Sequence, residues 1–456
     1  NCVDVCPAKE KALVMKPLES QLPQQRNWDY IVKNIGYKQV VDKTKSVKNL
    51  QFAQPLFEFS GACAGCGETP YIKAISQLFG EKMYISNATG CSSIWGGTAS
   101  ISPYTVNKDS GHGPAWCNSL FEDNAEHGFG MYLGQKAIRD SLIEKTKALI
   151  AVEWTNADLK AAAQKYLDTV NDLEANAAAT KAYVAVLEEN VATVDELAQV
   201  PQFAEHAAEL KAKGEKYCDC DACALGADIL SKKDYLSKKS VWIFGGDGWA
   251  YDIGFGGLDH VLASGEDVNV MVFDTEMYSN TGGQASKASN IGEVCQFAAA
   301  GKEISKKSLS EIAMTYGYIY VAQIALGANM NQAVKAIAEA EAYPGPSLII
   351  GYAPCELHGV KGGMTNCQNE MKKAVEAGYW NLFTFNPANK AQGKNPFTLT
   401  SKAVDAEKYQ ALLANETRYS RLTRAFPDRA KQLFARNEQV ANDRYEHLTR
   451  LVELYK

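Results

Sequence analysis

The sequence lacks the long apolar runs that cross a membrane. The nearest candidate, residues 316–328, is 13 residues long and contains Gln323, whereas a transmembrane helix needs roughly 18 or more apolar residues. Basic residues are not in excess either, since 47 Lys and Arg face 53 Asp and Glu for a net charge of -6. Nucleic acids attract proteins with a surplus of positive charge. We therefore expect neither a membrane nor a nucleic acid as partner.

The first residues also lack the charged segment and apolar segment that make up a secretory signal. Nothing in them indicates an oxidising compartment, so we expect a cytoplasmic location. The 12 cysteines then need an explanation in a reducing environment. There, grouped cysteines indicate metal binding or catalysis more often than disulfides.

Glycine is missing from two long segments. Residues 155–213 contain no glycine, a single proline and 16 alanines, with Asn156 placed to cap a helix. This composition predicts a helical insertion, at about residues 140–235, without chemistry of its own. No glycine follows Gly393, and residues 396–456 are predicted to form a helical C-terminal extension. Residues 17–55 are polar and lack periodicity, which is typical of a connecting arm.

Short apolar segments that end in polar turns recur between these regions: MYISNATGC, VWIFGGDG, VNVMVFDTE and SLIIGYAPC. Segments 307–317 and 329–342 have helical character and separate the later strands. The alternation predicts an α/β fold with a doubly wound, mostly parallel sheet, in which ligands bind beyond the carboxyl ends of the strands. Cys91, Asp247, Thr275 and Cys355 each follow a predicted strand, so we expect them to converge.

Two of these turns indicate a phosphate and magnesium site. Asp247 lies in GGDGWAYD, and Thr275 lies in DTEMYSNTGGQ, 28 residues later. A carboxylate, a hydroxyl and a loop carbonyl can share Mg2+ with a diphosphate, and glycines let the backbone approach the phosphates. A nucleotide-binding Rossmann turn is a weaker interpretation, because GGDGWAYD does not have the G-x-G-x-x-G spacing.

Four cysteines form a second candidate site. Cys63 and Cys66 make a C-x-x-C in GACAGCGETP, and Cys91 and Cys355 follow two predicted strands. Four thiolates hold either a [4Fe-4S] cluster or a structural zinc ion, and the number of ligands does not separate the two. Within GACAGCGETP, Thr69 is predicted to cap the next helix.

The N-terminal cysteines suggest another iron–sulfur domain. Cys2 and Cys6, followed by proline, match the last two positions of the ferredoxin run C-x2-C-x2-C-x3-C-P. We therefore expect residues 1–16 to be the end of a two-cluster ferredoxin-like domain that lies mostly upstream.

The remaining cysteines carry weaker signals. CDCDAC has a metal-like spacing at Cys218, Cys220 and Cys223, but a surface loop with free or locally paired thiols is the favoured interpretation. We expect three others to be small buried hydrophobic residues, and they are Cys117, Cys295 and Cys367. His358 is expected to be a hydrogen-bonded structural residue.

Taken together, the Asp247 and Thr275 turns resemble the diphosphate-binding motif of thiamine diphosphate enzymes. They depart from it at one point, because Thr275 stands nearest the position of the usual asparagine, and Asn280 follows five residues later. The longer segments CAGCGETPY and GDGWAYDIGFGGLDHVLASGEDVNVMVFDTEMYSNTGGQASKAS resemble the C-terminal domain of the pyruvate:ferredoxin oxidoreductase family. The resemblance runs from Cys2 to roughly Cys355.

This resemblance implies a thiamine diphosphate-binding domain at residues 56–395 and a role for each motif. Asp247, Thr275 and the Met277 carbonyl would hold Mg2+, and Asn280 would reach toward the reacting carbon. Glu68 and Cys91 would border the cofactor. The diphosphate end would be lined by two segments: Gly246, Asp247, Gly248 and Trp249, and Thr275, Glu276, Met277, Tyr278, Ser279 and Asn280.

In the same family the four cysteines Cys63, Cys66, Cys91 and Cys355 bind the [4Fe-4S] cluster nearest the cofactor, and two more clusters lie in the ferredoxin-like domain. Oxidation of the cofactor adduct one electron at a time needs a nearby acceptor, and zinc has no redox chemistry. The resemblance therefore favours the cluster over zinc.

The implied reaction converts pyruvate and coenzyme A to acetyl-CoA and CO2, with electrons passed to ferredoxin or flavodoxin by a homodimer. The coenzyme A site, the glutamate that activates thiamine and an arginine for the substrate carboxylate would lie upstream. Three alternatives remain open: the thiamine-binding part of an oxidoreductase for another 2-oxoacid, a non-redox thiamine enzyme, and an electron carrier that has lost thiamine binding. The ferredoxin-like start and the length of the insertion favour the pyruvate enzyme.

Overall fold

The computed structural model describes residues 3, 8, 10–37, 40–97 and 102–456. Cys2 and Cys6, predicted to bind upstream clusters, lie outside the described residues. The chain divides into two compact units, one of residues 1–128 with 241–456 and the other of residues 129–240. We call them the sheet unit and the helical unit. The helical unit is somewhat longer than the insertion predicted at about residues 140–235.

An eight-stranded sheet forms the centre of the sheet unit, in the order β10-β9-β7-β8-β4-β3-β1-β2. Parallel pairing joins β1 to β2, β3 to β4, β4 to β8 and β8 to β7. At one edge of the sheet, β9 pairs antiparallel with both β7 and β10. The predicted α/β fold with a doubly wound, mostly parallel sheet is confirmed. The strands are β1 (Met83–Asn87), β2 (Ala115–Asn118), β3 (Ser240–Gly246), β4 (Asn269–Asp274), β7 (Tyr320–Ile324), β8 (Ser347–Tyr352), β9 (Phe383–Phe385) and β10 (Phe397–Leu399), with a separate hairpin of β5 (Met277–Tyr278) and β6 (Gln284–Ala285).

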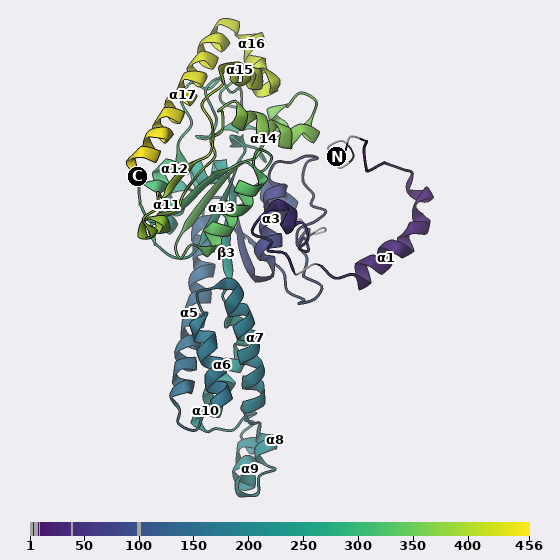
Figure 1. The fold of residues 1–456 in the computed structure, drawn as a ribbon, viewed down its shortest axis with the longest axis vertical. Helices are drawn as coiled ribbons and strands as arrows, with labels where there is room; N and C mark the ends of the chain where they lie inside the picture. Colours follow the sequence, from purple (N-terminus) through teal and green to yellow (C-terminus); the bar gives the residue numbers. More distant parts are fainter. Residues whose placement is uncertain (1–2, 4–7, 9, 38–39, 98–101) are drawn as a thin grey trace. The chain divides into compact units, whose positions relative to one another are not determined.

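Helices cover both faces of this sheet, as Figure 1 shows. The chain moves from β3 to β4 in one direction along the sheet and from β7 to β8 in the other, so right-handed crossovers place α11 and α13 on opposite faces. Strands covered on both sides are apolar throughout, and β4 and β8 are buried at every residue. The helices of this unit are α1 (Gln25–Asn34), α2 (Val47–Leu50), α3 (Thr69–Phe79), α4 (Cys91–Gly97), α11 (Phe255–Ala263), α12 (Leu309–Met314), α13 (Met330–Ala342), α14 (Cys367–Glu376), α15 (Ala406–Asn415), α16 (Thr417–Ala425) and α17 (Pro427–Leu454).

The C-terminal extension packs on the sheet unit. Leu422, Ala430 and Leu433 from α16 and α17 form a buried cluster with Ile291. The extension is not helical from its predicted start at residue 396, because Phe397–Leu399 form β10, which pairs with β9. A three-residue edge strand is too short to show a periodic pattern in the sequence.

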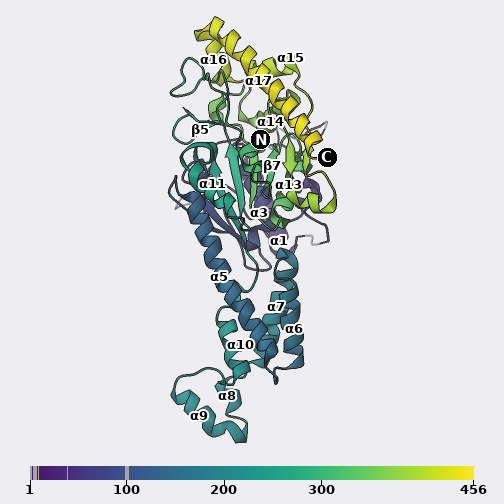
Figure 2. The ribbon, with the colours of Figure 1, turned by 90° about the vertical axis from the view of Figure 1, so that its left-hand side faces the viewer.

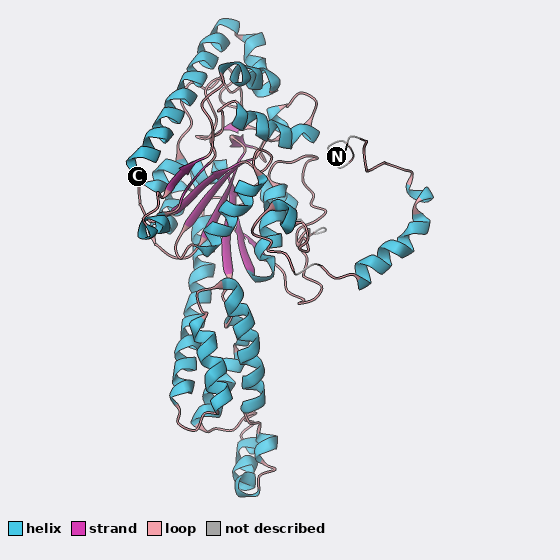
Figure 3. Ribbon diagram, in the orientation of Figure 1, coloured by secondary structure: helices cyan, strands magenta, loops and turns pink. Residues whose placement is uncertain are grey.

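The helical unit has its own core. Helices α5 (Asn124–Ala151), α6 (Ala157–Asp168), α7 (Leu173–Asn190) and α10 (Asp221–Ser231) surround a buried cluster that includes Leu142, Tyr166, Tyr183 and Leu187. Figure 3 shows the helices of this unit in cyan. The predicted cap is confirmed, since the side chain of Asn156 accepts hydrogen bonds from two backbone amides at the start of α6. Two short helices, α8 (Val194–Leu197) and α9 (Ala204–Ala212), follow at one end of this unit (Figure 2).

In the part of the chain that the structure describes, no helix combines the length and the apolar character that crossing a bilayer requires.

Candidate active site

Loops that follow four strands meet at the end of the sheet where the parallel strands terminate. Because β3, β4 and β8 are parallel neighbours, their carboxyl ends reach the same edge, and Asp247, Thr275 and Cys355 follow them. The Ala353 amide donates to the Asp274 carbonyl (2.9 Å), which continues the pairing into these loops. Cys91 begins α4, after β1. The convergence predicted for these four residues is confirmed by Cys91, Asp247 and Thr275 lining one cavity and by Cys355 neighbouring Cys91.

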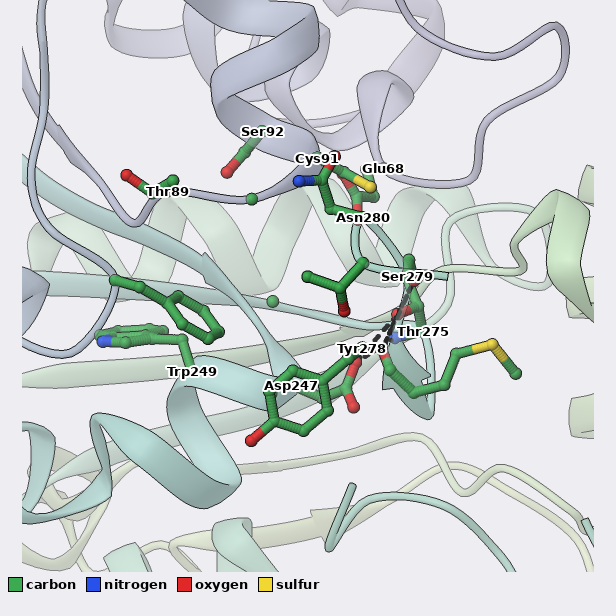
Figure 4. Close-up of a pocket in the computed structure, with 16 residues that line it drawn as sticks. Glu68, Thr89, Cys91, Ser92, Asp247, Trp249, Thr275, Tyr278, Ser279 and Asn280 are labelled. Carbon is green, nitrogen blue, oxygen red and sulfur yellow. Dashed lines mark hydrogen bonds between the residues drawn. The ribbon is translucent and has the colours of Figure 1, made fainter. Parts of the chain in front are cut away.

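This cavity has a volume of about 150 Å³. Figure 4 shows Glu68, Cys91 and Asn280 toward one end of it and Asp247 and Thr275 toward the other. Every residue expected to border the cofactor lines the cavity except Glu276. The full lining is Glu68, Thr89, Gly90, Cys91, Ser92, Phe121, Gly246, Asp247, Gly248, Trp249, Thr275, Met277, Tyr278, Ser279, Asn280 and Thr281.

Five of the lining residues were missed by the sequence reasoning: Thr89, Gly90, Ser92, Phe121 and Thr281. Three of them flank Cys91, and Thr281 follows Asn280, so the neighbouring motifs could have indicated them. Phe121 follows the short edge strand β2 and carries no motif. Only the fold brings it to this cavity.

Oxygen atoms cluster around the fully buried carboxylate of Asp247. The backbone amide and hydroxyl of Thr275 donate to Asp247 Oδ1 at 3.1 and 2.9 Å, and the hydroxyl of Ser286 donates to Oδ2 at 2.5 Å. Thr275 Oγ1 also lies 2.9 Å from the Met277 carbonyl oxygen and 2.6 Å from Ser279 Oγ. Burial, with the nearby Asp274 carboxylate, raises the pKa of Asp247 well above its usual value. A carboxylate, a hydroxyl and a carbonyl oxygen thus meet at one point, and this donor set suits Mg2+.

A buried histidine makes a hydrogen bond to the backbone of this loop. His358 donates from Nε2 to the Thr275 carbonyl oxygen over 2.8 Å, so the hydrogen-bonded structural role predicted for it is confirmed. Burial and the nearby Arg418 guanidinium lower the pKa of His358 to about 3. The imidazole is therefore neutral at physiological pH.

Glu276 points away from the cavity, although it lies between Thr275 and Met277. Its carboxylate contacts Lys306 Nζ (3.0 Å), Arg418 Nη1 (2.8 Å), the Tyr379 hydroxyl (2.6 Å) and Asn290 Nδ2 (2.6 Å). Burial alone raises the pKa of Glu276, but the Lys306 and Arg418 charges outweigh it and lower the pKa to about 2. The backbone of Glu276 has a φ of 61°, a left-handed conformation that is rare outside glycine. Glu276 therefore anchors the loop rather than bordering the cavity.

The same network includes more buried charges. Arg418 from α16 also contacts Glu416 (2.7 Å) and Glu293 (3.3 Å), and Lys306 contacts Asp274 (2.8 Å). We call these residues, together with Glu276, the buried ion network. It connects the loop after β4 to the C-terminal helices.

Glu68 lines the cavity and also lies near the cysteines. It is buried, and its Oε2 accepts a hydrogen bond from Trp95 Nε1 (2.6 Å). Burial raises the pKa of Glu68 to about 7, against the opposing effect of the Trp95 hydrogen bond. Thr69 is the first residue of α3 and Glu68 occupies the capping position, so the predicted Thr69 cap is wrong by one residue.

The four predicted ligand cysteines are neighbours. Burial raises the pKa of Cys91, and the charges of Glu68, Cys355, Cys66 and Cys63 raise it further. A close backbone contact brings two of their loops together: a Cβ on Gly67 would lie 2.7 Å from the Pro354 backbone nitrogen. Only glycine tolerates this approach.

These four thiols are less closely grouped than the ligands of one zinc ion. Zinc–sulfur bonds of about 2.3 Å place tetrahedral ligand sulfurs roughly 3.8 Å apart. Among the described residues, no three of Cys63, Cys66, Cys91 and Cys355 have sulfurs that all lie within 4.8 Å of one another. In a cubane cluster each thiolate binds a different iron atom, so the sulfurs stand further apart.

Of the other cysteines, Cys295 and Cys367 are buried as predicted. Cys117 is exposed, and its prediction as a buried residue is wrong. It lies on β2, the last strand of the sheet, where one edge has no neighbouring strand to cover it.

Comparisons with known proteins give this site a context. Residues 222–350 match the family model described as thiamine pyrophosphate enzyme, C-terminal TPP binding domain. The chain is 50% identical over 455 residues to pyruvate:ferredoxin oxidoreductase of Moorella thermoacetica, and 48% identical over 451 residues to pyruvate-flavodoxin oxidoreductase of Klebsiella pneumoniae. Over this length, the chain is a homologue of pyruvate:ferredoxin and pyruvate-flavodoxin oxidoreductases.

The matches cover 99% of this chain but 36% of each of these two relatives, so the chain spans about a third of their length. Among solved structures, 2-oxoglutarate:ferredoxin oxidoreductase from Magnetococcus marinus matches with 13% identity and a TM-score of 0.34, covering 70% of this chain and 69% of that one. That similarity is too low to support an inference. The sequence relatives and the match to the thiamine pyrophosphate-binding family model confirm the resemblance seen in the motifs.

The buried ion network predicts a large effect of Arg418→Ala on stability. The substitution leaves the carboxylates of Glu276, Glu293 and Glu416 without their shared guanidinium, and breaking a buried ion pair costs about 3–5 kcal/mol. Urea unfolding should show a decrease of this size in the free energy of unfolding. Arg421→Ala is the matched control, because Arg421 is exposed on the same helix, and surface changes of this kind stay within about 0.5 kcal/mol. Equal effects of the two variants would contradict the assignment.

Gly248 offers a second test. A Cβ at this position would lie 2.6 Å from the ring of Tyr278, so Gly248→Ala must displace that ring and should destabilise the protein by about 1–3 kcal/mol. Tyr278→Ala removes the obstacle, and the double variant should lose less than the sum of the two single losses. Gly256→Ala is the control, because its Cβ would meet open space. Thermal unfolding of the four variants measures these differences, and strict additivity would refute the proposed contact.

Proposed function

We propose that this chain is the thiamine diphosphate and proximal-cluster part of an enzyme that converts pyruvate and coenzyme A to acetyl-CoA and CO2. Electrons would pass through [4Fe-4S] clusters to ferredoxin or flavodoxin. The observation that carries the proposal is that Cys91 and Glu68 line the cavity and also neighbour the other three cysteines. The cofactor site and the electron acceptor would thus have Cys91 and Glu68 in common.

For Mg2+, the ligands from this chain would be a carboxylate oxygen of Asp247, the Thr275 hydroxyl and the Met277 carbonyl. Their mutual contacts of 2.9 Å support this assignment. Phosphate and water oxygens would supply the other ligands of Mg2+. Gly246 leaves room beside them, since a Cβ there would meet only the Phe273 carbonyl oxygen at 3.9 Å, and this space suits a diphosphate.

Thiamine diphosphate, when bound, stabilises the carbanion that decarboxylation of a 2-oxoacid leaves, and an adjacent iron–sulfur cluster accepts its electrons singly. The side chain of Asn280 lies at the same end of the cavity as Glu68 and Cys91 (Figure 4), which supports a place for its amide beside the reacting carbon. Cys63, Cys66, Cys91 and Cys355 would hold the cluster. The wide spacing of their sulfurs favours this cluster over zinc.

The remaining parts of the proposal concern the longer protein. Pockets for ligands of cofactor size measure about 300–1,000 Å³, so a cavity of about 150 Å³ suits a site completed by other domains. We propose that upstream domains supply the coenzyme A site, the thiamine-activating glutamate, a substrate-binding arginine and a ferredoxin-like domain that ends at residue 16 with Cys2 and Cys6. We also propose a connecting arm at residues 17–55, a thiamine domain at 56–395 and a helical extension at 396–456. The protein would be a homodimer in the cytoplasm.

The magnesium assignment predicts that Asp247→Asn abolishes tight cofactor binding. The amide lacks the negative charge that Mg2+ needs, so the affinity for Mg2+ and thiamine diphosphate should fall by more than about 100-fold. Equilibrium dialysis of both ligands with the purified longer protein, which includes the upstream domains, measures this loss. Asp252→Asn is the control, because Asp252 lies outside the cavity and pairs with Lys287 (2.9 Å). Similar binding by the two variants would refute the assignment.

The cluster assignment predicts a change in metal content for Cys355→Ser. Protein purified without oxygen should lose about four iron and four sulfide per chain, because three cysteines no longer retain the cubane. Cys117→Ser, at an exposed cysteine outside the set, should keep them. Iron and sulfide analysis with electron paramagnetic resonance of the reduced protein measures both. Zinc in place of iron in the unsubstituted protein would overturn the redox function.

A further inference from the structure

Three cysteines of the helical unit form a cluster that the thiamine site does not use. The Sγ atoms of Cys218, Cys220 and Cys223 all lie within 4.8 Å of one another. Among the described residues, no other set of three His, Cys, Asp or Glu ligand atoms is this close. The sequence favoured a surface loop with free or locally paired thiols here. The three thiols are free, and the fold brings all three sulfurs close together.

Backbone hydrogen bonds hold this thiol cluster in place. The Cys218 amide donates to the Ala192 carbonyl (3.0 Å), and the Val194 amide donates to the Lys216 carbonyl (3.0 Å). These bonds tie the loop that carries Cys218 to the segment after α7. The Cys220 carbonyl accepts from the Ala224 amide (2.8 Å) as α10 begins. Two sulfurs therefore come from a fixed loop and the third from the first turn of a helix.

The cluster lies at the start of α10, beside the core of the helical unit. Cys220 occupies the N-cap position of α10, and its side chain makes no capping hydrogen bond. Cys223 is the third residue of the same helix. Burial, with the neighbouring Cys220 and Cys218, raises the pKa of Cys223 to about 12, so a bound cation would have to displace the proton of this thiol. Cys223 is buried in the core cluster of this unit, and Cys218 and Cys220 pack against that cluster.

We propose that Cys218, Cys220 and Cys223 bind one thiophilic d10 cation, Zn2+ or Cu+, as three thiolates. Tetrahedral zinc places its ligand sulfurs roughly 3.8 Å apart, and soft thiolates select these two ions. No fourth protein ligand from the described His, Cys, Asp and Glu residues completes the group. Zn2+ would take water at its open position, whereas Cu+ would be three-coordinate.

A disulfide is the competing explanation, and it accounts for the geometry less well. It would join two of the sulfurs, release two electrons to an oxidant and leave the third thiol unpaired. A bound cation uses all three sulfurs, and its binding releases the protons of the three thiols to solvent.

Site-resolved alkylation tests the proposal on the full 456-residue chain, reduced and kept without oxygen. The chain is treated with Zn2+ alone, Cu+ alone or chelator alone, then with iodoacetamide, and peptides are analysed by mass spectrometry. We expect at least one ion to lower the alkylation rate of Cys218, Cys220 and Cys223 together, by about 10-fold or more, as tight thiolate binding requires. The exposed Cys117 should react equally in every arm. A competing chelator then ranks the two ions.

A variant separates this site from the other cysteines. Cys220→Ser keeps a good helix cap and should fold normally by circular dichroism, yet it should bind one equivalent of the protecting ion less than the unsubstituted chain. Cys117→Ser should bind the same amount as the unsubstituted chain. Equal alkylation with and without both ions would overturn the proposal. So would thiols that become reactive only after a reductant is added, since that result indicates a disulfide.

Discussion

The pairing of Glu276 with Arg418 inside the protein determines the path of the loop after β4, and the candidate active site depends on that path. The Thr275 hydroxyl contacts both Asp247 and the Met277 carbonyl, while the Glu276 side chain between Thr275 and Met277 points away from the cavity. The backbone of Glu276 is left-handed, which costs about 1–2 kcal/mol outside glycine. Four polar partners around the buried carboxylate offset this cost and hold a single conformation.

This arrangement gives the C-terminal helices a role in the site. Arg418 lies on α16, far along the chain from the loop that it supports, and the helices around it are packed by their own apolar cluster with Ile291. Replacing a buried ion network with apolar residues is often neutral or stabilising, so stability alone is a weak reason for its presence. Its evident use here is geometric, since a carboxylate with charged partners on several sides cannot change direction without losing them.

The cysteines of the two units differ in a way that matches their proposed ligands. In the sheet unit, four thiols lie near Glu68, and among the described residues no three of their sulfurs lie within 4.8 Å of one another. In the helical unit, three sulfurs lie within the reach of a single ion. Sulfur spacing in the fold, more than spacing along the sequence, would separate the proposed cluster site from the proposed single-ion site.

The sequence by itself determined the class of fold and most of the candidate site. Apolar segments of strand length that end in polar turns identified the parallel sheet, because strands buried on both faces must be apolar. The same turns identified Asp247, Thr275, Cys91 and Cys355 as candidate site residues, because parallel strands deliver their carboxyl ends to one end of the sheet, and the C-x-x-C spacing identified Cys63 and Cys66. Only the tertiary structure decided the direction of Glu276, the exposure of Cys117, the place of Phe121 and the convergence of Cys218, Cys220 and Cys223. Each of these depends on contacts between residues distant along the chain or on a local backbone turn, and neither leaves a periodic pattern in a single sequence.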